Sequence, residues 1–197
     1  MLTIEERNGQ LLLTQLFTHI WFGEWDHYEK VLNQLPDELK ESFPFHPYYN
    51  REDFELWYEN YFSIPGVYFI PPYVSSYTEK TEEAIDRSRQ DLLCLIGKFE
   101  EMGFYYPIEK GEFPDHIGSL TAFLSAAATE EIKAEQEGNT ELARQLRNAQ
   151  LDMYQSHIKQ GLKKVARHSK RKLEDPFFSV FIPYYLDTMK ELFDTHK

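Results

Sequence analysis

The chain has 197 residues, enough for the core of one domain, and its 42% hydrophobic and 27% charged residues exclude a disordered protein. A formal net charge of −12 argues against nucleic-acid binding, which needs a basic face, and suits a partner that carries arginine or lysine. The single cysteine, Cys94, excludes an internal disulfide and a thiolate-rich metal site, and its apolar neighbours predict a buried structural thiol.

Two helices are predicted at the start of the chain. Thr3 to Glu6 form a capping box, and apolar residues then recur at spacings of three and four as far as Gly23, which can end the helix. A second helix is expected over residues 25–35, because Pro36 closes it.

An aromatic, proline-containing region follows. Residues 42–49 read as a connector, since residues before proline avoid helical angles. Asn50 predicts the next helix start, with aromatic residues at helical spacing up to Phe62. Residues 63–77 form the longest irregular stretch, and Pro71-Pro72 makes part of it extended and rigid. A loop so long and so aromatic is expected to be packed, partly exposed and functional.

The second half of the chain again predicts helices. A long helix is expected from Thr78 to about Met102, where Gly103 stops it. A helix starting at Pro114 and a further one over residues 140–172 are separated by a break at Gly138-Asn139.

A final aromatic helix begins at Asp175-Pro176, by the signal of a cap followed by proline. No alternation of period two is long enough to predict a strand. We therefore expect an all-α fold, a single-domain helical bundle of roughly seven to nine helices spanning residues 1–197.

The N-terminal residues lack a basic segment followed by an apolar one, and no apolar run is long enough to span a bilayer. The expected location is the cytoplasm, with no stable membrane insertion.

Residues 112–118 combine strong acids, an imidazole and a helix-start signal. Pro114 suits the first turn of a helix, which would place Asp115 near the positive end of the helix dipole, with His116 beside it. This stretch predicts either a capped helix start or a polar recognition point at the mouth of a groove.

Catalysis finds little support in the sequence. The nine glycines are scattered, so no phosphate-binding loop is formed, and the histidines show no one-turn metal-ligand pattern. Asp115 and His116 are neighbours on a predicted helix and do not face each other, and no nucleophile elbow exists. We expect no catalytic residue, no metal and no cofactor, and we favour peptide recognition over an enzyme.

Two motifs resemble the TorD/DmsD group of redox-enzyme maturation chaperones, which is related to the NarJ type. Phe62 is followed after nine residues by Pro71-Pro72-Tyr73 and then by Ser76-Tyr77, similar to the proline-proline loop of that group. Residues 112–117 resemble its second motif. The likeness covers most of the chain, including the order of the last helices.

The resemblance implies an all-helical cytoplasmic chaperone. It would bind the N-terminal twin-arginine signal peptide of a molybdenum-cofactor oxidoreductase and hold back export until the cofactor is loaded. It implies a monomer, with a domain-swapped dimer as the alternative. The residues expected to bind the peptide are Tyr58, Tyr61, Phe62, Pro71, Pro72, Tyr73, Ser76, Tyr77, Glu112, Pro114, Asp115 and His116.

Three alternatives stay open. A NarJ-like chaperone would bind an N-terminal segment of a molybdoenzyme subunit that is not exported. A nucleotide-binding or enzymatic protein could share the fold. A structural adaptor could use the only basic cluster, which includes Lys163, Lys164 and Lys170; otherwise these residues form a solvated helix end.

Overall fold

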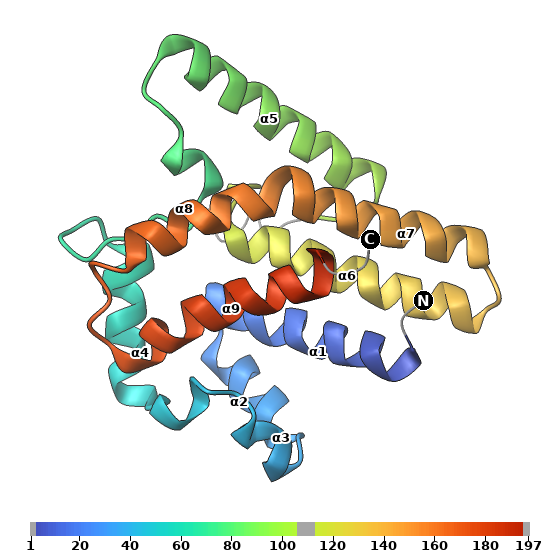
Figure 1. Ribbon diagram of the computed structural model, residues 1–197, viewed down its shortest axis with the longest axis horizontal. Helices are drawn as coiled ribbons and strands as arrows, with labels where there is room; N and C mark the ends of the chain where they lie inside the picture. The colour runs from blue at the N-terminus through green and yellow to red at the C-terminus, as the bar shows by residue number, and fades with distance from the viewer. Residues whose placement is uncertain (1–2, 106–112, 195–197) are drawn as a thin grey trace.

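The computed structural model describes residues 3–105 and 113–194, and most of these residues are helical (Figure 1). The α-helices are α1 (Ile4–Trp21), α2 (Trp25–Asn33), α3 (Asp37–Glu41), α4 (Arg51–Tyr58), α5 (Glu82–Glu101), α6 (Ile117–Gln136), α7 (Thr140–Met153), α8 (Lys159–Ser169) and α9 (Pro176–Asp194). Shorter turns of helix are η1 (His46–Tyr48), η2 (Glu59–Ser63), η3 (Val74–Tyr77) and η5 (Tyr154–Ile158). The predicted all-α bundle is confirmed, and no strand is present among the described residues.

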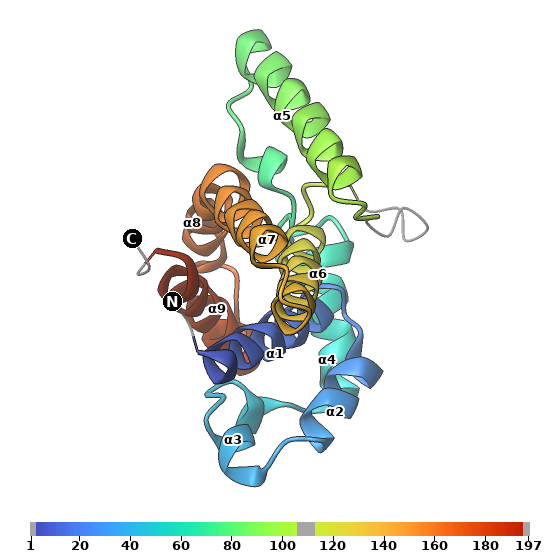
Figure 2. The same cartoon turned by 90° about the vertical axis from the view of Figure 1, so that its right-hand side faces the viewer.

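The bundle is built from α1, α6, the continuous rod of α7, η5 and α8, and α9. Helix α1 packs along α6, α6 packs along α7, and α8 contacts α9. Helices α2 and α3 lie on one side of this bundle, whereas α5 extends from the opposite side (Figures 1 and 2). Among the described residues, no helix is both long and apolar enough to cross a membrane.

Aromatic rings fill the core between α1, α9 and the segment around α4. Phe17 and Trp21 of α1 contact Phe181 and Tyr185 of α9, with ring centroids 5.0–5.9 Å apart. Most of these pairs meet edge to face, the arrangement that the ring quadrupoles prefer. Among the described residues, the largest fully buried rings are Phe17, Trp21, Tyr28, Phe45, Phe54, Tyr61, Phe99, Phe177, Phe178, Phe181 and Tyr185.

Helix ends that depend on local chemistry lie where the sequence predicts them. The capping box of α1 is present, with Glu6 N donating to Thr3 Oγ1 and Thr3 N donating to Glu6 Oε2. Gly138 has a φ of +76° beyond the end of α6, and Asp175 caps α9 by accepting from Phe178 N at 3.0 Å.

Two helical predictions need correction. The long helix α5 begins at Glu82 with Thr81 as its cap, rather than at Thr78, because Thr81 Oγ1 accepts from Ala84 N. The helix predicted over residues 140–172 ends at Ser169 and is interrupted by the π-helical turn η5, so α7 and α8 are separate α-helical segments of one rod.

The prediction of a buried Cys94 is wrong. The thiol is exposed, as is 69% of the neighbouring Leu93, whereas Leu95 and Phe99 are buried. The physical reason is that α5 buries only one stripe of its surface. An apolar run of consecutive residues winds around a helix, so part of it faces away from the bundle.

A buried polar network joins α1, α6 and α7. Arg7 is 6% exposed and forms ion pairs with Glu131 and Glu135, and Arg147 also pairs with Glu131. The Glu131 carboxylate further accepts from Gln150 Nε2 at 2.7 Å. Two cations and an amide therefore depend on one buried carboxylate.

Replacing Glu131 by alanine should lower the free energy of unfolding by about 3 kcal/mol, because it removes one of the two carboxylates that pair with the buried Arg7 and the acceptor of the buried Gln150 amide. Urea unfolding followed by circular dichroism measures this change. The control is Glu130→Ala one position earlier, where the side chain is exposed and the loss should stay within about 0.5 kcal/mol. Equal losses in the two variants would contradict a stabilising role for the network.

Candidate functional site

The two sequence motifs pair directly through their backbones. Tyr73 and His116 form an isolated antiparallel bridge. Val74 N donates to the Asp115 carbonyl at 3.2 Å, and Ile117 N donates to the Pro72 carbonyl at 2.8 Å. The proline-proline loop and the start of α6 are therefore one structural unit, although about forty residues separate them in the sequence.

The start of α6 differs from the prediction. The helix begins at Ile117 with His116 as its cap, so Pro114 and Asp115 lie in the preceding turn and not in the first helical turn. His116 Nδ1 accepts from Gly118 N at 3.0 Å. A backbone N–H can only donate, so this imidazole is the neutral tautomer with its hydrogen on Nε2. Its ring stacks on Phe22, with centroids 5.1 Å apart.

Asp115 is a buried carboxylate with one oxygen unused. The residue is 5% exposed. Its Oδ2 accepts from Ser75 N at 2.7 Å, which ties the carboxylate to the first turn of η3. Its Oδ1 is buried and accepts no hydrogen bond from any described residue. Buried polar atoms are nearly always satisfied, so such an acceptor calls for a donor from outside the chain.

Asp115 lines a cavity of about 430 Å³ between α5, η3, the start of α6 and the η5–α8 rod. Apolar side chains of this pocket are Val74, Leu92, Leu95 and Leu120. Its polar or weakly polar residues are Ser75, Thr78, Ser88, Asp91, Cys94, Lys98, Asp115, Ser156, His157, Gln160 and Lys164. We call this hollow the Asp115 pocket. Its size and mixed lining fit a peptide segment with apolar side chains and at least one polar anchor.

The cations at the pocket rim already have partners. Lys98 Nζ lies 2.5 Å from Asp152 Oδ2 and 3.3 Å from His157 Nε2, and it lowers the pKa of Asp152 through a hydrogen bond. Burial, and then the charge of Lys98, lower the pKa of His157. Lys164 Nζ donates to the Tyr77 carbonyl at 3.3 Å. The buried acceptor of Asp115 thus stands beside cations that are engaged elsewhere.

A close contact between η3 and α8 fixes the floor of the pocket. Gly161 lies in the first turn of α8, where a Cβ atom would come within 2.6 Å of Val74 Cγ2. Only glycine lets Val74 approach the α8 backbone so closely, and this approach sets how near Ser75 and Asp115 lie to the η5–α8 rod.

Not all of the predicted binding residues reach this pocket. Tyr61 and Phe62 are 0% and 5% exposed and belong to the aromatic core. The Tyr61 hydroxyl accepts from the backbone N–H groups of Glu174 and Asp175 and so holds the start of α9. Tyr58 donates to the Trp21 carbonyl at 3.0 Å and lines a separate hollow.

Most residues of the proline-proline loop stabilise the conformation of the loop itself. Pro72 is buried and Pro71 half-buried, and the Tyr77 hydroxyl donates to the Pro71 carbonyl at 2.8 Å. Burial raises the pKa of Tyr77, so this phenol remains a donor. The half-buried Tyr73 contacts His116 edge to face, whereas Ser76 is exposed. Glu112 lies outside the described residues.

The basic cluster forms a second hollow of about 620 Å³ beside the Asp115 pocket. It is lined by Tyr77, Lys164, Arg167, His168, Arg171 and Lys172, and Lys164 lines both hollows. Lys172 Nζ donates to the Phe69 carbonyl at 2.5 Å, so part of this basic surface fastens the irregular loop to α8.

The described residues thus form an all-helical bundle with a pocket of about 430 Å³ that Asp115 helps to line. The chain belongs to the nitrate reductase delta subunit family, whose sequence profile matches residues 30–167, more than two thirds of its length. That family is part of the molybdoenzyme maturation chaperone superfamily, which includes the TorD/DmsD group, so the predicted membership is confirmed. No curated protein matches the chain significantly.

Family membership makes this protein a molybdoenzyme assembly chaperone whose partner is a molybdoenzyme subunit. The family consists of chaperones rather than enzymes. The matched segment contains η3, Asp115 and Gly161, and therefore the whole Asp115 pocket.

Gly161→Ala should displace η3 and lower the free energy of unfolding by about 1–3 kcal/mol, the usual cost of overpacking. Gly97→Ala is the matched control, because Gly97 is also inside a helix and a Cβ there meets nothing within 4 Å. The control should gain about 0.5–1 kcal/mol from helix propensity. Thermal and urea unfolding measure both; a Gly161→Ala protein as stable as Gly97→Ala would disprove the close contact.

His157 should make stability depend on pH. Its folded pKa lies below its ordinary value of 6.5, so the unfolded chain takes up a proton first as the pH falls. The stability that the neutral His157 gives the folded protein is present above the ordinary pKa of 6.5. It is lost as the pH falls toward the lower pKa of the folded state. Between about pH 7.5 and about pH 5.5 the wild type should therefore lose more stability than His157→Gln. His46 and His168 also have lowered pKa values, but they contribute equally to both proteins. Identical pH profiles would contradict the lowered folded pKa of the half-buried His157.

Proposed function

We propose that the Asp115 pocket binds an arginine-bearing segment at the N-terminus of a molybdoenzyme catalytic subunit, and that this segment is a twin-arginine signal peptide. The chaperone would then act in the cytoplasm, before the client is exported. One observation carries the proposal: Asp115 lines the pocket, and one of its two carboxylate oxygens is buried and accepts no hydrogen bond from a described residue.

A guanidinium group is the best donor for this oxygen. A buried acceptor left unsatisfied costs about 1–3 kcal/mol, and a hydrogen bond to a charged group returns about that much. Arginine offers five N–H donors in a planar fork, whereas Ser75 N already occupies the other oxygen of Asp115. The net charge of −12 further favours the approach of a cationic segment.

The apolar lining supports the same partner. Leu92 and Leu95 of α5 face Val74 and Leu120 across the pocket, and apolar walls of this kind receive the hydrophobic part of a bound segment. In this arrangement Pro71, Pro72 and Tyr77 shape the loop, and His116 and Pro114 position Asp115. Tyr61 and Phe62 act through the core that supports η2 and α9.

A second candidate is favoured by the family match itself. The matching profile describes a nitrate reductase delta subunit, so the client segment could equally belong to a subunit that is not exported. Both candidates use the same carboxylate, and they differ in whether paired arginines are required.

Asp115→Asn tests the role of the charge, because the amide oxygen can still accept from Ser75 N. Binding of a fluorescent twin-arginine signal peptide should weaken about tenfold to a hundredfold, whereas a peptide with glutamine in place of both arginines should be affected little. Asp187→Asn is the matched control, an exposed aspartate on α9, and should leave affinity unchanged.

Fluorescence anisotropy titrations with the two proteins and two peptides give a double-mutant cycle. A coupling energy near zero would overturn the assignment of arginine to Asp115. Full binding of an N-terminal client segment without paired arginines, still sensitive to Asp115→Asn, would support the non-exported client instead.

A further inference from the structure

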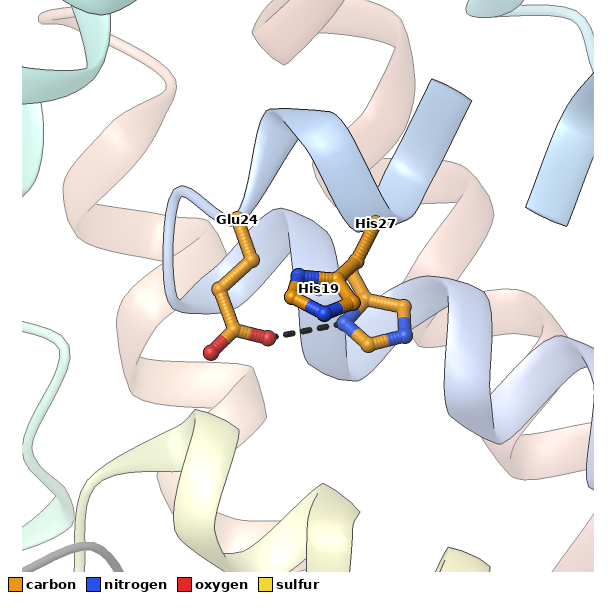
Figure 3. A group of neighbouring side chains, drawn as sticks. All are labelled: His19, Glu24 and His27. Atoms are coloured by element: carbon orange, nitrogen blue, oxygen red, sulfur yellow. Dashed lines mark hydrogen bonds and ion pairs between the residues drawn. The ribbon is translucent and has the colours of Figure 1, made fainter. Parts of the chain in front are cut away.

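A cluster of metal-ligating side chains lies at the elbow between α1 and α2, away from the Asp115 pocket. One ligand atom each from His19, Glu24 and His27 lies within 4.8 Å of the other two. His19 Nδ1 is 2.8 Å from Glu24 Oε2, and the two imidazole rings stack with centroids 5.2 Å apart, as Figure 3 shows. This cluster precedes the segment matched by the family profile, so family membership does not account for it.

The backbone of the elbow holds two of these groups together. Glu24 N donates to the His19 carbonyl at 2.8 Å, and Gly23 N donates to the Ile20 carbonyl at 3.2 Å. Gly23 has a φ of +64°. This is a Schellman motif, in which the third residue from the helix end and the second residue beyond the cap come into contact. That contact is usually hydrophobic, but here it consists of an imidazole and a carboxylate.

His27 completes the group from the first turn of α2. It lies three residues after Glu24 and therefore on the same side of the helix. Trp21 and Trp25, which flank the elbow, are 1% and 3% exposed and anchor it in the core. His19 and Glu24 are partly exposed and His27 is exposed, so an ion can reach the cluster from solvent.

We propose that His19, Glu24 and His27 form a binding site for a divalent transition-metal ion, with Zn²⁺ as the representative. Two imidazoles and one carboxylate are ligands typical of zinc and unlike the all-oxygen sets preferred by Mg²⁺ and Ca²⁺. Three protein ligands leave a fourth position for water or for a group from a partner. The bound ion would join the end of α1 to the start of α2.

Binding requires a small movement and a change in the position of one hydrogen. Ligand atoms around tetrahedral Zn²⁺ are about 3.4 Å apart at bond lengths near 2.1 Å, so the exposed His27 side chain has to close the longer distances by about 1 Å. The hydrogen between His19 Nδ1 and Glu24 Oε2 has to leave this position, because a coordinating nitrogen must offer a free lone pair. The neutral imidazole can carry that hydrogen on Nε2.

Isothermal titration calorimetry with ZnCl₂ tests the site on untagged, chelator-treated full-length protein. We expect one ion per chain, and Mg²⁺ at the same concentration should give no heat of binding. His27→Gln and Glu24→Gln should each weaken Zn²⁺ binding at least about tenfold, since even outer-shell changes cost that much. His168→Gln replaces an exposed histidine far from the elbow and should leave binding unchanged.

A second readout separates the site from a general effect on folding. Histidine ring signals followed by NMR should show His19 and His27 shifting together on addition of Zn²⁺, with His168 unaffected. Absence of stoichiometric binding, or equal weakening in His168→Gln and His27→Gln, would overturn the proposal. Because His27 is exposed, its replacement should leave the circular dichroism spectrum and the peptide affinity of the protein intact.

Discussion

The backbone pairing of Tyr73 with His116 is the contact on which the rest of the site depends. Its two peptide hydrogen bonds hold the proline-proline loop against the residues that precede α6. Prolines cannot donate, so the loop contributes the Pro72 carbonyl and the Val74 N–H to the pairing. The same pairing brings Ser75 N to Asp115 Oδ2 and leaves Oδ1 without a donor from the described chain.

The aromatic residues stabilise the core of the bundle, whereas Asp115 lines the pocket. Rings from α1, α4, η2 and α9 pack edge to face and give the bundle a rigid interior. This interior fixes the ends of α1 and α6, where Phe22 stacks on His116. Helix α5 lies outside the main bundle (Figure 2). Several of its residues, including Leu92 and Leu95, line the Asp115 pocket. Because α5 packs loosely on the bundle, it can move to admit a segment of chain while Asp115 stays in place.

Features encoded in a few adjacent residues could be predicted from the sequence. The capping box at Thr3, the turn at Gly138 and the Asp175 cap depend only on local chemistry. The start of α6 was placed too early because a tertiary pairing keeps Asp115 outside the helix. The exposure of Cys94, and the burial of Tyr61 and Phe62, depend on which face each helix packs, which periodicity alone does not specify. His19 lies on a different helix from His27, and only the glycine turn between the two helices indicates that His19, Glu24 and His27 could meet.

The proposed function requires that an arginine of the client donates a hydrogen bond to the unused Oδ1 of Asp115. A crystal structure of the protein with the N-terminal segment of its molybdoenzyme partner tests this claim most directly. The account predicts a guanidinium nitrogen about 2.7–2.9 Å from Asp115 Oδ1, with Ser75 N still bound to Oδ2. A segment bound at another surface, with Oδ1 still lacking a donor from the peptide, would contradict it.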